Sequence, residues 1–270
     1  MSTAAVLDRP TAGSVVVPES DEHRRERDLR ARIQVVAAVC GPLFTVGFFV
    51  GWGLIAGFIP VPSPSRPQDE VVAYYQQHSD RIILGLIITM GSAMLVAPFV
   101  LVLSRQLKRI EGPARILGPV QTFGGTVTSA VLVVCCLIFL AAAFRPERDP
   151  DITLLLNDLG FTMFIGPYAP AVGQCLAVAF AVFSDRRAEP LLPRWVGYVN
   201  VWIAVMFLPG PLLFFFMDGP FAWNGIVVFW LPAVTFGLWF YVMAWVIVGA
   251  VRREREDLRR AGAHAEAVTA

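Results

Sequence analysis

Six polar side chains lie at the edges of long apolar runs or inside them, and a bound ligand could use their chemistry. Carboxylates can bind a cation or a polar headgroup, and amides can donate and accept hydrogen bonds. Because an unpaired polar group in apolar surroundings is costly, each of the six needs a partner. The candidate ligand-binding residues are Asp158 and Asp218 at the edges of the runs and Gln121, Gln174, Asn200 and Asn224 within them.

Asp218 and Asn224 belong to the stretch "MDGPFAWNG" between two runs rich in Phe and Val. Its Gly-Pro pair breaks helices and Asp tolerates turn geometry, so the stretch is interpreted as a turn between two helices. A ligand contact is the alternative, because charged groups that border a membrane cavity are often functional. As part of a turn, Asp218 should pair or hydrogen-bond with a neighbouring loop, and Arg145 and Arg148 are the candidate partners.

Gln121, Gln174 and Asn200 interrupt three different apolar runs. Such neutral polar residues commonly hydrogen-bond one another between membrane helices. Alternatively, they line a pocket. The sequence alone leaves both interpretations open.

Other chemistry is poorly supported by the sequence. The runs contain no ionisable residue that a proton-coupled pump would need and no His that could ligate haem. Common catalytic motifs are absent, all four cysteines fall inside apolar runs, and His78 beside Asp80 is too small a set for a zinc site. The sequence therefore predicts no cofactor, no metal site and no catalytic residue, which argues against an enzyme without excluding one.

The elements that must position these side chains are transmembrane helices. Hydrophobic residues make up 56% of the 270 residues and the mean hydropathy is +0.62, above the usual apolar share of about 45–50%. The excess is concentrated in six blocks, each longer than the roughly 20 residues that cross a hydrocarbon core. These blocks cover residues 33–59, 82–104, 116–144, 159–184, 196–217 and 221–250. The sequence thus predicts an all-α, polytopic bundle of six membrane-spanning helices.

Two polar tails flank this transmembrane domain of residues 33–250. Residues 1–32 are expected to be disordered and then basic, and residues 251–270 form a basic C-terminal tail. The charged parts of both tails are expected to continue the first and last helices. Lys and Arg number 17 beside one side of the spans and four beside the other. The positive-inside rule therefore predicts that both tails are cytoplasmic.

The partners expected from the sequence are lipids. Basic clusters beside a membrane attract anionic lipids by about 1 kcal/mol per residue, and nucleic-acid binding is not expected because no folded domain presents the arginines to a groove. In the first span, glycines at four-residue spacing favour close helix packing. This packing is expected within the chain, and a homodimer is the alternative. The glycines are Gly47, Gly51, Gly53 and Gly57.

The loops on the less basic side carry most of the acids outside the tails. In the first, Pro67 followed by Asp69 and Glu70 predicts the start of a short helix that caps the bundle or lies on the membrane. The second, "FRPERDPDITLLLNDLG", has mixed charges at high density, and is expected to be a solvated, self-paired loop that includes Asp158. A cation or headgroup site there is the alternative.

Four segments resemble a group of uncharacterised actinobacterial membrane proteins with six spans. They are "KRIEGP" at 108–113, "AAFRPERDP" at 142–150, "LPRWVGYVNVW" at 192–202 and "DGPFAWNG" at 218–225. The resemblance implies a multi-pass protein of the bacterial inner membrane, and it implies no activity.

Two functional hypotheses follow. In the first, a non-enzymatic membrane protein binds or handles a small apolar molecule, or assists a membrane partner. In the second, a transporter or membrane-embedded enzyme uses the acidic residues of the outer face. The unknown ligand and the oligomeric state are not determined by the sequence.

Overall fold

A computed structural model describes residues 21–110 and 116–269, all of which belong to helices or their connections, with no strand among them. Six helical segments of this part of the chain are long and apolar enough to cross a membrane. They are Arg24–Ile55, Gln68–Ile110, Leu117–Phe144, Pro150–Ser184, Arg194–Phe214 and Ile226–Arg260. The prediction of an all-α bundle with six spans is confirmed.

Most spans consist of more than one helix. The α-helices are α1 (Asp21–Phe48), α2 (Gln68–Ala93), α3 (Val96–Ile110), α4 (Leu117–Phe144), α5 (Pro150–Ile165), α6 (Ala169–Ser184), α7 (Arg194–Phe207) and α8 (Leu231–Thr269). Two π-helices, η1 (Phe49–Ile55) and η3 (Ile226–Trp230), and a 3₁₀-helix, η2 (Gly210–Phe214), adjoin them. Only the third span, α4, is a single uninterrupted α-helix.

Prolines lie near the interruptions. Pro98 is in the first turn of α3, Pro167 separates α5 from α6, Pro209 precedes η2, and Pro232 is in the first turn of α8. A proline lacks the backbone N–H that a helix interior needs, but is tolerated in the first turn, where that N–H has no helical partner. The prolines thus help to divide the spans into shorter rigid helices.

Two spans begin earlier than the apolar blocks predict. Helix α2 starts at Gln68, with a non-helical residue at His78, and its first segment buries Val71 and Tyr75 against the bundle. Helix α5 starts at Pro150, where Asp149 caps it by accepting a hydrogen bond from the backbone N–H of Asp151. The helix start predicted from Pro67, Asp69 and Glu70 is confirmed, although this helix is the first segment of α2 and not a separate short helix. The start of α5 was not predicted, because its Asp149 cap lies in polar sequence that hydropathy does not register.

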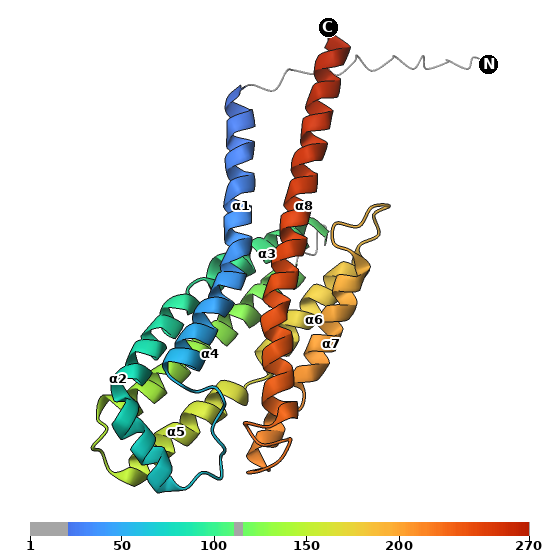
Figure 1. The fold of residues 1–270 in the computed structure, drawn as a ribbon. Helices are drawn as coiled ribbons and strands as arrows, with labels where there is room; N and C mark the ends of the chain where they lie inside the picture. The colour runs from blue at the N-terminus through green and yellow to red at the C-terminus, as the bar shows by residue number, and fades with distance from the viewer. Residues whose placement is uncertain (1–20, 111–115, 270) are drawn as a thin grey trace, which may run out of the picture.

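Both ends of the described chain lie at the same end of the bundle, where α1 and α8 project beyond the other helices (Figure 1). These projections are the charged extensions expected of the first and last spans, which are confirmed as helical. The expected disorder of the N-terminal tail concerns residues 1–20, which lie outside the described residues.

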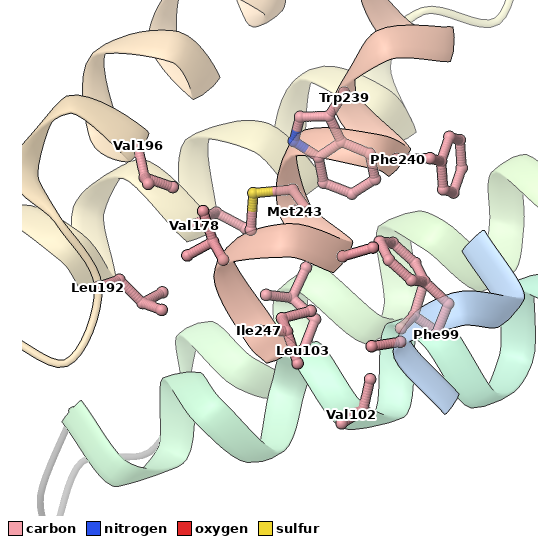
Figure 2. Packing of buried hydrophobic residues seen from close by; sticks show 14 of the residues in the cluster. Phe99, Val102, Leu103, Val178, Leu192, Val196, Trp239, Phe240, Met243 and Ile247 are labelled. Carbon is pink, nitrogen blue, oxygen red and sulfur yellow. The ribbon is translucent and has the colours of Figure 1, made fainter. Parts of the chain in front are cut away.

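Buried apolar side chains pack around α8 in the half of the bundle from which α1 and α8 project. Trp239, Met243 and Ile247 of α8 meet Leu103 of α3 and Val178 of α6, as Figure 2 shows, and all five are fully buried. The outside of the bundle is also apolar, because large side chains such as Leu54 and Trp245 are about 70% exposed. A hydrophobic exterior around a packed interior is the arrangement of a membrane-embedded helix bundle.

The glycines of the first span pack against the second span within the chain. A methyl group added at Gly51 would lie 2.5 Å from the carbonyl oxygen of Gly85, and one at Gly47 would lie 2.6 Å from Cβ of Ser92. Because neither glycine has a side chain, the backbones of the two spans can approach closely. The expected intramolecular packing is therefore found at Gly47 and Gly51.

Candidate functional site

An apolar cavity of about 160 Å³ lies inside the bundle. Its wall comes from α1, α3, α4, α5, α6, α7 and α8 and from η1, η2 and η3. An engineered protein cavity of roughly 150 Å³ with a similar apolar lining binds benzene or xenon. The cavity therefore has room for a molecule with about the size of one aromatic ring.

Irregular backbone surrounds this cavity. The break between α5 and α6 contributes Pro167, the π-helix η1 contributes Phe49, and the π-helix η3 contributes Val228 and Phe229. Within a membrane, non-helical backbone is tolerated only where protein covers it or where it lines a cavity. Single-turn π segments also occur frequently at functional sites. The interruptions of three spans thus meet around one internal space.

Phenylalanine is the most frequent residue in the cavity wall. Phe44 of α1 contacts Phe240 of α8, with ring centroids 5.1 Å apart, and Phe207 of α7 contacts Phe236 of α8 at 5.3 Å. Phe207 and Phe236 are only partly buried, so this part of the wall reaches the surface of the bundle that faces lipid.

Four hydrogen-bonding side chains line the cavity, and three of them have partners. Thr45 donates to the carbonyl oxygen of Gly41 at 3.2 Å, and Thr128 donates to that of Gly124 at 2.9 Å. The hydroxyl group of Ser129 donates to the carbonyl oxygen of Ala93 at 3.1 Å. Each hydroxyl has therefore used its single proton.

Gln174 of α6 is the fourth of these side chains, and it differs from the other three because it has no hydrogen-bond partner among the described residues. It is 1% exposed, and its Oε1 atom is buried without a hydrogen-bond partner. None of the hydrogen bonds among the described residues involves its side chain. Facing glycines leave room for it on α4, where a methyl group at Gly125 would lie 3.0 Å from its Nε2 atom. The amide of Gln174 is thus an unsatisfied polar group in the wall of an apolar cavity.

Gln121 of α4 is also fully buried, but it does not line this cavity. Its Oε1 accepts a long hydrogen bond of 3.5 Å from Thr122, and its Nε2 is buried without a partner. Gln121 lies one helical turn before Gly125 on α4. The two glutamines therefore differ in their access to the cavity, although both are buried and incompletely hydrogen-bonded.

Asn200 of α7 is satisfied by its neighbours. Its Oδ1 accepts a hydrogen bond of 2.9 Å from the indole N–H of Trp239, and its Nδ2 donates to the carbonyl oxygen of Val196 at 2.8 Å. The bond to Trp239 joins α7 to α8. Asn200 thus acts as a polar link between two helices, although its partner is an indole and not another amide.

The connection between η2 and η3 lies at the end of the bundle opposite the projecting α1 and α8 (Figure 1). Asp218 belongs to this connection and is exposed. Its Oδ1 accepts a hydrogen bond of 2.6 Å from the hydroxyl of Ser65 in the loop between η1 and α2, and Gly219 beside it has a φ of +82°. A turn with a bond to a neighbouring loop is as predicted. The partner is different, because Ser65 takes the place expected for Arg145 or Arg148.

A second bond holds the same two loops together. The indole N–H of Trp223 donates to the carbonyl oxygen of Pro62 at 2.8 Å, while its ring stacks on Phe161 of α5. Asn224, the next residue, is half-buried, and its side chain takes part in none of the hydrogen bonds among the described residues. Asn224 does not line the cavity.

Asp158 lies inside α5, not in a solvated loop as predicted, because α5 begins at its Asp149 cap. It is half-buried, and its Oδ1 accepts a hydrogen bond of 3.1 Å from Asn157. Two neighbouring acids are also engaged, since Asp149 caps α5 and Asp151 accepts a bond of 2.6 Å from Gln68 of α2. These acids support the helix ends.

The six candidate residues therefore do not form one site. In the described part of the chain, no hydrogen bond joins any of them to another. Gln174 alone lines the cavity. No group of three or more His, Cys, Asp or Glu side chains among the described residues could hold a metal ion.

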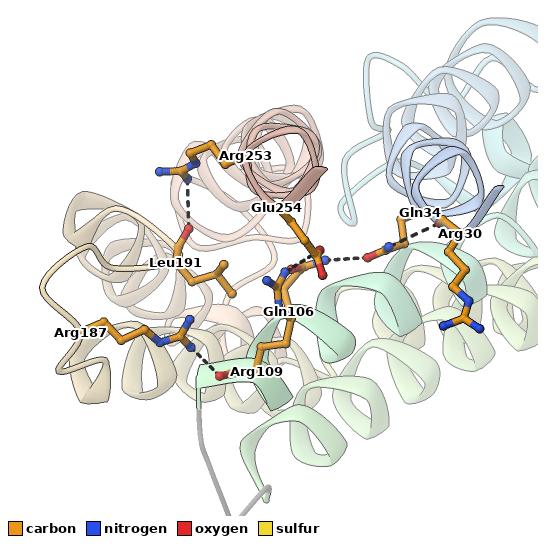
Figure 3. Close-up of polar contacts among 8 residues, drawn as sticks. All are labelled: Arg30, Gln34, Gln106, Arg109, Arg187, Leu191, Arg253 and Glu254. Atoms are coloured by element: carbon orange, nitrogen blue, oxygen red, sulfur yellow. Dashed lines mark hydrogen bonds and ion pairs between the residues drawn. The ribbon is translucent and has the colours of Figure 1, made fainter. Parts of the chain in front are cut away.

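The end of the bundle with the chain termini is held by polar contacts between α1, α3 and α8 (Figure 3). Gln106 of α3 donates to Gln34 of α1 at 3.0 Å, and Arg109 of α3 binds Glu254 of α8 at 2.8 Å. Above them, a cleft of about 420 Å³ lies between the projecting parts of α1 and α8 and is lined by arginines and glutamates. Its polarity differs sharply from that of the internal cavity.

The cavity phenylalanines were not among the predicted site residues. Phe44 and Phe48 lie one turn apart on α1, as do Phe236 and Phe240 on α8. This spacing places each pair on one helix face, which is the signal that could have found them. In a span that is apolar on every side, however, such a pair is indistinguishable from residues that face lipid.

No family model, curated protein or solved structure matches this chain.

Proposed function

We propose that the chain is a non-enzymatic, multi-pass protein of the bacterial inner membrane that binds a small apolar molecule inside its helix bundle. The observation that carries this proposal is the cavity of about 160 Å³ lined by phenylalanines and by the unsatisfied amide of Gln174. A natural core is close-packed, with few voids larger than a water molecule. A space of this size, bordered by interrupted helices, supports the proposal of a binding site.

The orientation proposed for this protein has both chain ends in the cytoplasm. Its support is the excess of Lys and Arg beside one end of the bundle. At that end the arginines of α1 and α8 would contact anionic lipids, which basic residues attract near a membrane surface. A ligand would then reach the cavity from the bilayer.

The alternative of a transporter or enzyme that uses the outer acids has less support. Asp149 and Asp151 accept hydrogen bonds at the start of α5, and Asp218 accepts one from a neighbouring loop. Asp158 accepts one from the adjacent Asn157 inside α5. These bonds lead to different partners and not to a common centre.

Binding of toluene to the purified protein in detergent tests the proposal. Toluene has the size and polarity that the cavity accepts, and a ligand that binds only the folded state raises the unfolding temperature. At a tenfold excess over its Kd, we expect the midpoint of thermal unfolding to rise by about 3 °C. The rise should saturate with toluene concentration.

Two variants of neighbouring residues separate cavity binding from partition into detergent. Ala233 lines the cavity, whereas Val234 is 51% exposed and points away from it. Ala233→Phe should fill the space and abolish the stabilisation, while Val234→Phe should retain it. Equal responses to toluene in the wild type and both variants would overturn the proposal.

A further inference from the structure

The unsatisfied amide of Gln174 indicates which class of apolar molecule the cavity binds. The amide is buried inside the bundle, yet it has no hydrogen bond among the described residues. Leaving a buried polar group unpaired is costly, and natural proteins retain few such groups. A side chain of this kind in a cavity wall is explained if the ligand supplies the missing partner.

The other polar groups of the wall offer no donor to Oε1 of this amide. Thr45, Thr128 and Ser129 have each donated their hydroxyl proton to a backbone carbonyl, so none can donate to Oε1 of Gln174. The remaining lining is mostly aromatic and aliphatic carbon. A ligand that carries its own hydrogen-bonding group on an otherwise apolar body would supply the partner that the wall does not.

We infer that the cavity binds a small apolar molecule that carries one hydroxyl group, such as a phenol or a short-chain alcohol, and that Gln174 binds this hydroxyl. This inference rests on the proposed function. A hydroxyl both donates and accepts, so it can bond to Oε1 or to Nε2 of the amide. The phenylalanines surround the apolar body, while Gln174 selects the functional group.

Phenol and toluene provide a matched pair of probes. They have the same number of heavy atoms and the same ring, and differ only in a hydroxyl in place of a methyl group. The ratio of their dissociation constants, each corrected for partition into detergent, isolates the contribution of the hydroxyl. We expect Gln174→Met to weaken phenol relative to toluene by about fivefold, the effect of one neutral hydrogen bond.

Gln121→Met is the matched control. Gln121 is a buried glutamine on the facing helix with one unpaired amide atom, but it does not line the cavity. The ratio of the phenol and toluene dissociation constants for this variant should equal that of the wild type. An equal loss of phenol preference in both variants would overturn the inference. A water molecule shared by the two amides would then explain their unpaired atoms.

The outcomes separate this inference from the proposed function. If toluene fails to bind the wild type, the cavity is not a binding site and the proposed function fails. If toluene binds but Gln174→Met leaves the ratio unchanged, the proposed function stands and the hydroxyl inference is wrong. Toluene binding by Gln174→Met also shows that the variant is folded.

A comparison on the wild type alone does not depend on any variant. Anisole resembles phenol but has no hydrogen-bond donor. After the same correction for partition, phenol should bind more tightly than anisole by about fivefold. Anisole binding as tight as that of phenol would contradict a site built around the donor of the ligand.

Discussion

Gln174 and Asn200 show how two buried amides in one bundle can have opposite roles. Asn200 is fully buried and bonded to Trp239 and to the backbone at Val196. Gln174 is buried to the same extent, but its Oε1 has no partner. A paired amide links helices. An unpaired amide beside a cavity weakens the empty protein and is available to a ligand.

This contrast predicts opposite effects of removing the two amides from the ligand-free protein. Gln174→Met removes an unsatisfied group and should raise the free energy of unfolding by up to about 1–3 kcal/mol. Asn200→Leu leaves the indole N–H of Trp239 without an acceptor and should lower it by about the same amount. Thermal unfolding in detergent measures both changes. A destabilised Gln174→Met would mean that the amide has a partner in the empty protein.

The helices are divided so that their interruptions meet around the cavity, while close packing is kept elsewhere. At the contact between the first two spans, Gly51 and Gly85 let the backbones approach until no methyl group would fit. Gly91, also on α2, faces open space with no atom within 4 Å of an added Cβ. The two glycine environments on these neighbouring spans therefore differ in what they tolerate.

Substitution by alanine distinguishes these two environments. Gly51→Ala places a methyl group against Gly85 and Thr89, so the spans must separate, and overpacking of this kind costs about 1–3 kcal/mol. Gly91→Ala meets no obstacle and should stabilise α2 by about 0.5–1 kcal/mol, because glycine disfavours a helix interior. Unfolding midpoints of the two variants test this. Equal tolerance of both would show that the spans are not in close contact at Gly51.

The whole molecule has two unlike ends joined by an apolar bundle. One end carries the projecting α1 and α8 with their arginines, and the other carries short loops held by the bonds of Asp218 to Ser65 and Trp223 to Pro62. This difference in basic residues between the two ends is the basis of the proposed orientation, since basic residues are retained on the cytoplasmic side.

Reporter fusions test this orientation. Alkaline phosphatase is active only outside the cytoplasm, so fusions at Pro62, Glu147 or Asp218 should be active. Fusions at Glu189 or Ala261, at the other end, should be inactive although expressed. Green fluorescent protein fused at the same five positions is the control, and its signal should show the opposite pattern. A reversal of both patterns would place the basic end outside.

The sequence by itself determined the number of spans and the turn at Asp218, because both depend on local properties. The length and apolarity of a segment decide whether it can cross a membrane, and a Gly-Pro pair beside an acid ends a helix wherever it occurs. The helical continuation of the charged tails was predictable for the same reason. The start of α2 was likewise predictable from Pro67, Asp69 and Glu70. The start of α5 was missed, because its Asp149 cap lies in polar sequence that hydropathy ignores.

Only the tertiary structure decided which polar residues are satisfied and where the cavity lies. Gln174 and Asn200 look alike in sequence, and their difference arises because Trp239 reaches one of them and nothing reaches the other. Likewise, Asp218 bonds to Ser65, which is 153 positions away along the chain. Such partners depend on how separate helices pack. In a membrane span that is apolar on every side, no periodicity reveals which face will meet a neighbour.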